Sequence, residues 1–274
     1  PMVGLLMAFE NYNFKKGIFG SEWVGLANFK RFFRYKNCWR LIRNTLLLNV
    51  FNMLWTTPIN IIFALMINEL TNRAFKKTVQ MISYMPHFIS TVVVCSMIHM
   101  FFNASTGVVN QIIRSLGGQP VEFLYSTTAF DHLYIWSGVW QGLGWGTIIY
   151  LANLSNVSPD LIEAARLDGA SRMDIVIHVN IPTILPTIVI MLILRIGSIM
   201  GVGFEKVFLL QTQRNISVSR VISTYVYELT LGSGGSTTYW DTSTAIGLFN
   251  SIVNLLLIIM TNTIARRISE ITLW

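Results

Sequence analysis

Long apolar runs constrain this 274-residue chain more than any other feature. A helix that crosses the hydrocarbon core of a bilayer needs about 20 mostly apolar residues. Strands of a membrane barrel are shorter, at about 9–11 residues, and their side chains alternate in polarity, which these runs do not. The sequence therefore predicts membrane-spanning helices, which we place at 45–67, 78–102, 132–154, 183–204 and 242–264.

The low content of charged residues supports this interpretation. Only 12% of the chain is charged, against about 25% in a typical soluble domain. Such a chain cannot cover a water-facing surface, so lipid must solvate much of it. The apolar segment 1–9 is too short to span, and we predict that it is the tail of a first spanning helix whose earlier residues precede this sequence. The expected fold class is an all-α membrane protein, with one transmembrane domain over 1–274.

Short basic loops predict the orientation, because Lys and Arg gather on the cytoplasmic side. Three such loops fall on one side of the predicted topology, and they contain Arg73, Lys76, Lys77, Arg166, Arg172, Arg266 and Arg267. The segment 10–44 conflicts with this rule, because it is also basic but falls on the outer side. Its basic and aromatic stretch 28–43 is predicted to lie along the outer interface as an amphipathic helix. In the outer loop 205–241, the run 232–236 has the composition of a flexible linker.

The loop 156–182, on the cytoplasmic side, predicts two short helices joined by a tight turn. Ser158 can cap the first helix, and Pro159 suits its first position, where a missing N–H costs nothing. Gly169 can adopt the left-handed conformation that ends this helix. Ser171 and Asp174 have the spacing of a capping box for the second helix. Pro182 is expected either to stop that helix or to begin the next span.

The same loop resembles the EAA loop of ABC importer permeases. Glu163-Ala164-Ala165 is followed at the family's spacing by Gly169, and then by Val179, Ile181 and Pro182. An ordinary capped hairpin would explain Ser158, Pro159 and Gly169, but not the whole spacing between two spans. In such permeases the loop docks on a cytoplasmic ATPase and transmits its movement. The resemblance implies that role for Glu163, Ala164, Ala165, Asp168, Gly169 and Pro182.

Further segments resemble carbohydrate permeases of the maltose-transporter type. These segments are 23–33, 43–49 and 140–151, while 203–210 and 268–274 resemble the oligosaccharide and polysaccharide branch. The resemblance implies a six-helix type I importer fold, with its first helix truncated here, in a multi-pass protein of the cell membrane. It also implies import of a carbohydrate, an oligosaccharide, delivered by an extracytoplasmic binding protein. The other implied partners are a second related permease subunit and two cytoplasmic subunits that bind ATP and Mg.

Other function classes fit the sequence less well. The chain has no Gly-Lys pair and hence no phosphate-binding P-loop, so we expect a transport subunit with no cofactor of its own and no enzyme activity. Its basic excess marks loops beside the lipid and does not indicate nucleic-acid binding. A permease for another small solute remains an alternative. So does a secondary carrier, although the spans lack the central Asp or Glu that coupling ions need. Cys38 and Cys95 are expected to be free thiols.

Polar and aromatic side chains in the spans are candidates for the substrate pathway. Arg195 interrupts an apolar span, where a charge costs about 2.5–3.5 kcal/mol, so we expect it to face the interior as a pathway residue or as part of an internal bonded pair. Aromatic rings beside amides suit sugars, but they are also common at membrane interfaces and between helices. The remaining candidates are Trp140, Gln141, Tyr150, Asn52 and Trp55.

Overall fold

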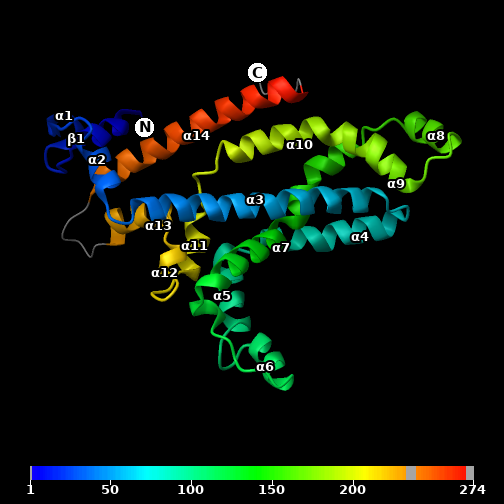
Figure 1. The fold of residues 1–274 in the computed structure, drawn as a ribbon, viewed down its shortest axis with the longest axis horizontal. Coiled ribbons are helices and arrows are strands. Elements are labelled where there is room, and N and C mark those ends of the chain that lie inside the picture. Colours follow the sequence, from blue (N-terminus) through cyan, green and yellow to red (C-terminus); the bar gives the residue numbers. More distant parts are fainter. Residues whose placement is uncertain (1, 233–238, 270–274) are drawn as a thin grey trace. The chain divides into compact units, whose positions relative to one another are not determined.

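The computed structural model describes residues 2–232 and 239–269, and its ribbon is almost entirely helical (Figure 1). Apart from Gly232, the predicted linker 232–236 lies outside the described residues. The chain divides into two compact units, and the three long helices α3 (Cys38–Asn68), α7 (Thr127–Leu154) and α14 (Trp240–Ser269) each contribute to both.

The first unit comprises Pro1–Val50, Thr91–Tyr134 and Ser198–Leu256. It begins with the 3-10 helix η1 (Met2–Phe9), and the strands β1 (Glu10–Asn11) and β2 (Glu22–Trp23) pair antiparallel, Glu10 with Trp23. Besides the first part of α3, the start of α7 and most of α14, its helices are α1 (Gly17–Gly20), α2 (Ala27–Arg34), α5 (Thr91–Phe101), α6 (Val108–Ser115), η3 (Phe123–Tyr125), α11 (Phe204–Leu210), α12 (Ile216–Ser219), α13 (Ile222–Tyr227) and the π-helix η5 (Glu228–Gly232).

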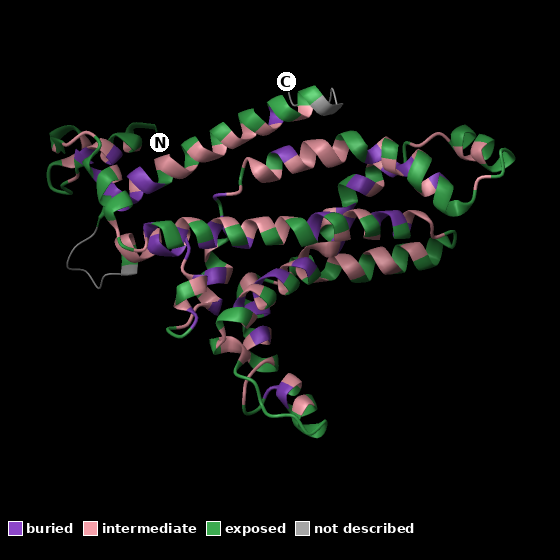
Figure 2. Ribbon diagram, in the orientation of Figure 1, coloured by how far each residue is buried: buried purple, intermediate pink, exposed green. Residues whose placement is uncertain are grey.

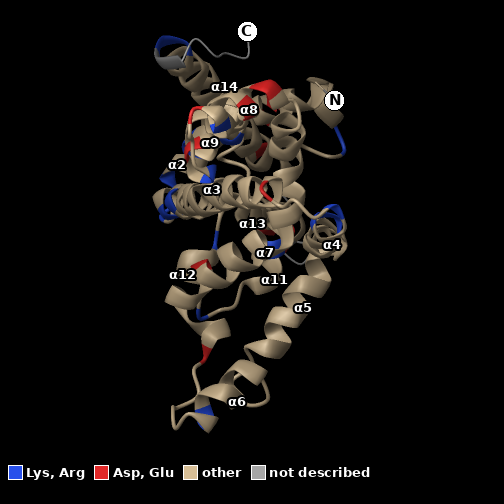
Figure 3. Ribbon diagram, turned by 90° about the vertical axis from the view of Figure 1, so that its right-hand side faces the viewer, with Lys and Arg blue, Asp and Glu red and all other residues tan. Residues whose placement is uncertain are grey.

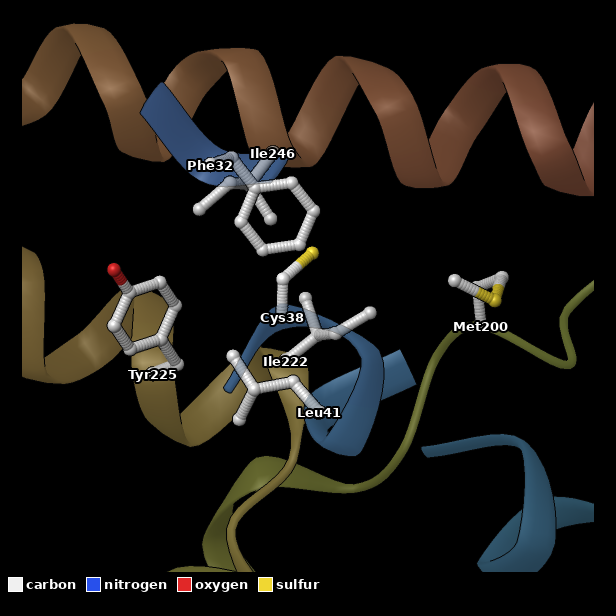
Figure 4. Close-up of a cluster of buried hydrophobic side chains, with 7 residues drawn as sticks. All are labelled: Phe32, Cys38, Leu41, Met200, Ile222, Tyr225 and Ile246. Carbon is white, nitrogen blue, oxygen red and sulfur yellow. The ribbon is translucent and has the colours of Figure 1, made fainter. Parts of the chain in front are cut away.

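A cluster of buried side chains holds the first unit together (Figure 4). It draws on α2, α3, α13, α14 and the segment after α10, and contains Phe32, Cys38, Leu41, Met200, Ile222, Tyr225 and Ile246. Cys38 is buried in this cluster as a free thiol, and Cys95 on α5 is likewise free and buried, as predicted. Burying one such apolar side chain contributes about 1.5–3 kcal/mol, so these distant segments stabilise one another.

The second unit comprises Phe51–Ser90, Ile135–Gly197 and Leu257–Trp274. It contains the rest of α3, α7 and α14, together with α4 (Arg73–Tyr84), η2 (Met85–Phe88), α8 (Pro159–Leu167), α9 (Arg172–Ile175), the π-helix η4 (Val176–Asn180) and α10 (Ile181–Ile196). Its core lies where α3, α7 and α10 meet, at Ala64, Leu65, Tyr150, Leu154 and Ile184. The hairpin of α8 and α9 lies at the end of this unit where α3 ends and α4 begins (Figure 1).

Among the described residues, three helices are long and apolar enough to cross a membrane: Cys38–Asn68, Arg172–Ile196 and Trp240–Arg267. Two shorter pieces, Arg73–Phe88 and Thr91–Phe101, form a fourth span if they are counted as one. Exposed and half-buried residues run along α10 and α14 (Figure 2), and long stretches of ribbon carry no charge (Figure 3). These features match a chain whose helices are solvated by lipid.

The helices differ from the sequence prediction in several places. The predicted span 78–102 is interrupted after η2, because Pro86 cannot donate a ladder hydrogen bond and Ile89 is extended. The predicted span 183–204 ends at Ile196, before Gly197 and two further glycines. The helix α7 covers the predicted span 132–154 but is less apolar than the three long spanning helices named above, because its middle contains four glycines, Ser137 and Gln141.

Two predictions for the N-terminal region were also wrong in detail. Residues 2–9 form the tighter helix η1 instead of an α-helical tail, and a segment this short is marginal as an isolated α-helix. The predicted amphipathic helix 28–43 is divided, because Tyr35 is extended at the end of α2 and the long helix α3 begins anew at Cys38.

Candidate functional site

The first helix of the loop 156–182, α8, begins as the sequence predicts. The side chain of Ser158 accepts a hydrogen bond of 3.3 Å from the backbone N–H of Asp160. Pro159 occupies the first position of α8, and Asp160 places a negative charge in the first turn, where the helix dipole favours it. The start of α8 is therefore fixed by side chains next to it in the sequence.

Gly169 ends α8 in a Schellman turn. Its φ of +83° lies in the left-handed region that favours glycine. The N–H of Ala170 donates to the carbonyl of Ala165 over 2.9 Å, and the N–H of Gly169 donates to Arg166 over 3.0 Å. These two bonds satisfy carbonyls that the helix end would otherwise leave unpaired. The EAA segment and Gly169 are thus parts of one locally determined turn.

The second helix begins with the predicted capping box. Ser171 Oγ accepts from the N–H of Asp174 over 3.3 Å, and the N–H of Ser171 donates to the carboxylate of Asp174 over 2.9 Å. Both groups are exposed, and a cap of this kind contributes about 0.5–2 kcal/mol to the stability of its helix. They aim α9 away from the turn at Gly169.

Pro182 neither stops the second helix nor begins a separate one. Helical structure continues from Arg172 to Ile196, and Pro182 lies in the first turn of α10. The turn before it widens into the π-helix η4, where the N–H of Ile181 donates to Val176. A proline ring collides with the carbonyl four residues earlier, and a π-turn makes room for it. The loop and the span are therefore one continuous helical rod.

Two contacts connect this rod to neighbouring helices of the second unit. The side-chain N–H of Asn180, which is buried, donates to the carboxylate of Glu69 over 3.5 Å, just after α3. Asn153 on α7 hydrogen-bonds to Thr187 on α10. A displacement of the hairpin would therefore reach α3 and α7 as well as α10.

The hairpin exposes both its EAA residues and several apolar side chains. Glu163 and Ala164 are exposed and Ala165 is half-buried. Leu167 is 89% exposed, and Leu161 and Met173 are also exposed. A large apolar side chain left in water marks a surface that another protein can cover. We did not single out these three residues in the sequence, although apolar residues in an otherwise polar hairpin are a signal that could have found them.

The candidate pathway residues lie in different surroundings within the second unit. Arg195 is half-buried, and its Nη1 donates to Thr57 Oγ1 of α3 over 3.3 Å. Tyr150 is only 3% exposed and belongs to the core cluster with Leu154 and Ile184. Arg195 is therefore hydrogen-bonded to a neighbouring helix, and Tyr150 is packed in the core of the unit. A contact of either residue with substrate stays a prediction.

The remaining pathway candidates are more open. Trp140 and Trp55 are both exposed, and the ring of Trp55 lies 5.1 Å from that of Trp136. Gln141 donates to the carbonyl of Ile89 over 2.7 Å, where the predicted span 78–102 is interrupted. Asn52 accepts from Thr56 one turn further along α3. The structure brings Trp55 close to Trp136, but it does not gather the candidates into one site.

A group of aromatic side chains that we did not predict lies where the predicted span 78–102 is interrupted, at η2. The ring of His87 stacks on Trp145 of α7, with centroids 4.4 Å apart and planes 4° apart, and Phe88 meets Trp145 edge-on. Pro86, beside His87 in an apolar run, is the sequence signal that could have revealed the break. Among the described residues, no group of three or more His, Cys, Asp or Glu could hold a metal ion.

Comparison with known proteins identifies the family. Residues 61–270 match the binding-protein-dependent transport system inner membrane component. LplB of Bacillus subtilis (strain 168) is 40% identical over 98% of this chain and 84% of its own length. The polygalacturonan/rhamnogalacturonan transport system permease protein YteP of the same organism is 40% identical over 98% of this chain and 83% of its own.

The fold matches a solved transporter as well. A chain in the crystal structure of a bacterial alginate ABC transporter, in complex with an alginate pentasaccharide-bound periplasmic protein, superposes with a TM-score of 0.89. It is 37% identical, and the match covers 100% of this chain and 90% of that chain. The chain therefore belongs to the family of the binding-protein-dependent transport system inner membrane component, the membrane-embedded permease subunits of ABC transporters.

Proposed function

We propose that this chain is a permease subunit of an ATP-driven importer that takes up an oligosaccharide, delivered by an extracytoplasmic binding protein. The observation that carries the proposal is the hairpin of α8 and α9. It exposes the EAA residues at the end of one unit and continues without a helical break into the spanning helix α10. A soluble partner that moves the hairpin would therefore move a membrane span.

In this proposal α8 docks on a cytoplasmic ATP-binding subunit. Two such subunits hold ATP and Mg, and this chain contributes no cofactor. Leu161 and Leu167 offer the apolar contact, while Glu163 supplies a charge beside the small side chain of Ala164. When the ATP-binding subunits close, α9, η4 and α10 move as one rod. The contacts of Asn180 with Glu69 and of Asn153 with Thr187 pass that movement to α3 and α7.

The substrate class rests on the relatives. YteP is named for transport of polygalacturonan and rhamnogalacturonan, and the solved transporter was crystallised with an alginate pentasaccharide on its periplasmic protein. Both are chains of sugar units, which favours an oligosaccharide here as well. A second related permease would complete the pathway, and the cell membrane is the expected location. Arg195, Trp140, Gln141, Tyr150, Asn52 and Trp55 remain the proposed pathway residues.

The docking role of α8 can be tested with one apolar contact and a matched control. We expect Leu167→Asp to reduce the amount of ATP-binding subunit that copurifies by about tenfold or more, because burying a leucine contributes about 1.5–3 kcal/mol and about 1.4 kcal/mol is tenfold in affinity. Leu116→Asp is the control, since Leu116 is 83% exposed at the end of α6. Copurification is measured in mild detergent without the binding protein.

A second variant tests the turn itself. Gly169→Pro should abolish uptake in vesicles while the chain still inserts, because proline cannot adopt the positive φ of this position. Equal recovery of the ATP-binding subunit with Leu167→Asp and Leu116→Asp, together with normal uptake by Gly169→Pro, would remove the coupling role. Uptake that continues without any ATP-binding subunit would favour a secondary carrier instead.

A further inference from the structure

The segment that leads into α3 carries an uncompensated positive charge. Six exposed cations lie within 30–43, and no Asp or Glu occurs between Glu22 and Glu69. Arg31 is paired with Asp241 at 3.4 Å and donates to Thr242 over 2.9 Å. Within the described residues, four of the others make no ion pair: Lys30, Arg34, Lys36 and Arg40. These four cations of the exposed face therefore have no carboxylate of the described residues within ion-pair distance.

The fold holds the cationic face outward. Asn28 and Phe32 form the buried side of α2, and Phe32 packs into the core cluster of the first unit (Figure 4). The side chain of Asn28 donates to the carbonyls of Ala8 and Glu10 over 3.1 and 2.8 Å. These contacts fix the rotation of α2 about its axis. Lys30 and Arg34, one turn apart, consequently point to the surface.

A cavity opens beside these cations. Its volume is about 420 Å³, and it is lined by Ala27, Lys30, Arg31, Arg34, Tyr35 and Tyr225. Tyr35 and Tyr225 stack with centroids 4.7 Å apart, and Arg220 donates to the hydroxyl of Tyr35 over 2.9 Å. Arg220 is already neutralised by Glu228. Lys30 and Arg34 are therefore the cations of the cavity lining without an ion pair, while Arg31 already shares its charge with Asp241.

The surroundings of the cavity favour a lipid headgroup as that anion. The exposed cations extend beyond the cavity, because Arg40 and Arg43 lie on the first turns of the spanning helix α3. Trp39 is 74% exposed and Phe33 is also exposed among them. Aromatic rings beside cations at the start of a span are typical of the membrane interface, whereas a soluble anion needs neither.

We propose that this cavity and the cationic face of 30–43 bind the phosphate of an anionic phospholipid headgroup at the membrane surface where α3 begins. Arg34 can present two N–H donors to phosphate oxygens, Lys30 adds a point charge, and Arg31 can add a donor other than the Nη1 that bonds Asp241 and Thr242. Anionic headgroups would also account for the many cations in a segment that the predicted topology places opposite the basic loops. They supply the counter-charge that this segment lacks. The site is independent of the proposed substrate.

The test uses the purified transporter containing this chain, with short-chain phosphatidylglycerol as the probe and phosphatidylcholine of equal chain length as the neutral comparison. Binding is followed by the thermal unfolding midpoint and by native mass spectrometry of retained lipid. One basic residue beside an anionic headgroup layer is worth about fivefold in affinity, so the double substitution Lys30→Gln/Arg34→Gln should weaken phosphatidylglycerol binding roughly 30-fold. The control Lys15→Gln/Lys16→Gln removes the same charge from exposed positions away from the cavity and should bind as wild type does.

Three results would overturn the proposal. The first is a wild-type protein that retains and responds to both lipids equally, a measurement that needs no variant to fold. The second is an equal loss of binding in both double substitutions, which would mean that net charge acts without a site. The third is that soluble trigalacturonate displaces phosphatidylglycerol and that trigalacturonate itself no longer binds to Lys30→Gln/Arg34→Gln. That result would assign the cavity to a sugar carboxylate.

Discussion

The close approach of α7 to the end of α4 depends on the missing side chain of Gly144. A Cβ built at Gly144 would lie 2.2 Å from the carbonyl oxygen of Ser83 and 2.6 Å from the ring of Tyr84. Real Cβ contacts are essentially never under 3.0 Å, so Gly144→Ala would force the two backbones apart. The neighbour that must move is a backbone carbonyl, which cannot rotate away as a flexible side chain can.

The magnitude follows from two opposing contributions. Forcing an extra methyl group into a packed interface costs about 1–3 kcal/mol, while replacing a helical glycine by alanine recovers about 0.5–1 kcal/mol of backbone entropy. The net effect of Gly144→Ala is therefore a destabilisation of about 1 kcal/mol, because the midpoints of the two contributions are about 2 and about 0.75 kcal/mol. Gly142, on the preceding part of the same helix, is the matched control, because a Cβ there meets nothing within 4 Å. Gly142→Ala should recover the entropy without the collision.

The two variants should thus change stability in opposite directions. Thermal unfolding midpoints in a single detergent, followed by tryptophan fluorescence, measure the difference. We expect a lower midpoint for Gly144→Ala and an unchanged or higher midpoint for Gly142→Ala. Equal midpoints would show that α7 and α4 do not pack at this distance, and would refute the close helix contact in the second unit.

Two further predictions concern half-buried cations. Burial lowers the pKa of Lys206 to about 8, although its Nζ donates to the carbonyl of Tyr134 over 2.8 Å. Between pH 8 and 10.5 the lysine binds a proton in the unfolded chain but not in the folded one. The free energy of unfolding should therefore rise with pH in this window, by on the order of 3 kcal/mol in total. The same rise in the variant Lys206→Met would contradict this prediction. Arg195→Lys removes the planar fork of donors and should reduce uptake of anionic oligosaccharides more than of neutral ones. The variant Thr57→Val, which removes only the hydrogen-bond partner, should leave the ratio of anionic to neutral oligosaccharide uptake unchanged. An equal loss of uptake of both kinds of sugar in Arg195→Lys, with a reduced protein yield, would mean that the arginine has a structural role.

The hairpin was predictable from the sequence because short-range contacts determine it. Ser158, Gly169 and the pair Ser171 and Asp174 each act on backbone groups no more than a few residues away. Their geometry therefore follows from residue type and spacing alone. The same holds for the membrane environment, because the length and apolarity of the runs do not depend on how the helices pack. The helix α14 begins two residues before its predicted span, and α3 ends one residue after its predicted span but begins seven residues before it.

Contacts between residues far apart in the sequence were determined only by the tertiary structure, because sequence spacing does not show which helices meet. Tyr150, a predicted pathway residue, packs with Ala64 and Ile184, and such neighbours depend on how helices distant in the sequence meet. The fold also supplies Thr57 as a hydrogen-bond partner of Arg195, whose contact with substrate stays a prediction. The cavity beside Lys30 and Arg34 exists only because α13 brings Tyr225 against Tyr35. Local chemistry thus determines where the helices of this chain begin and end and that they enter a membrane, whereas long-range packing determines which of their faces remain free to bind.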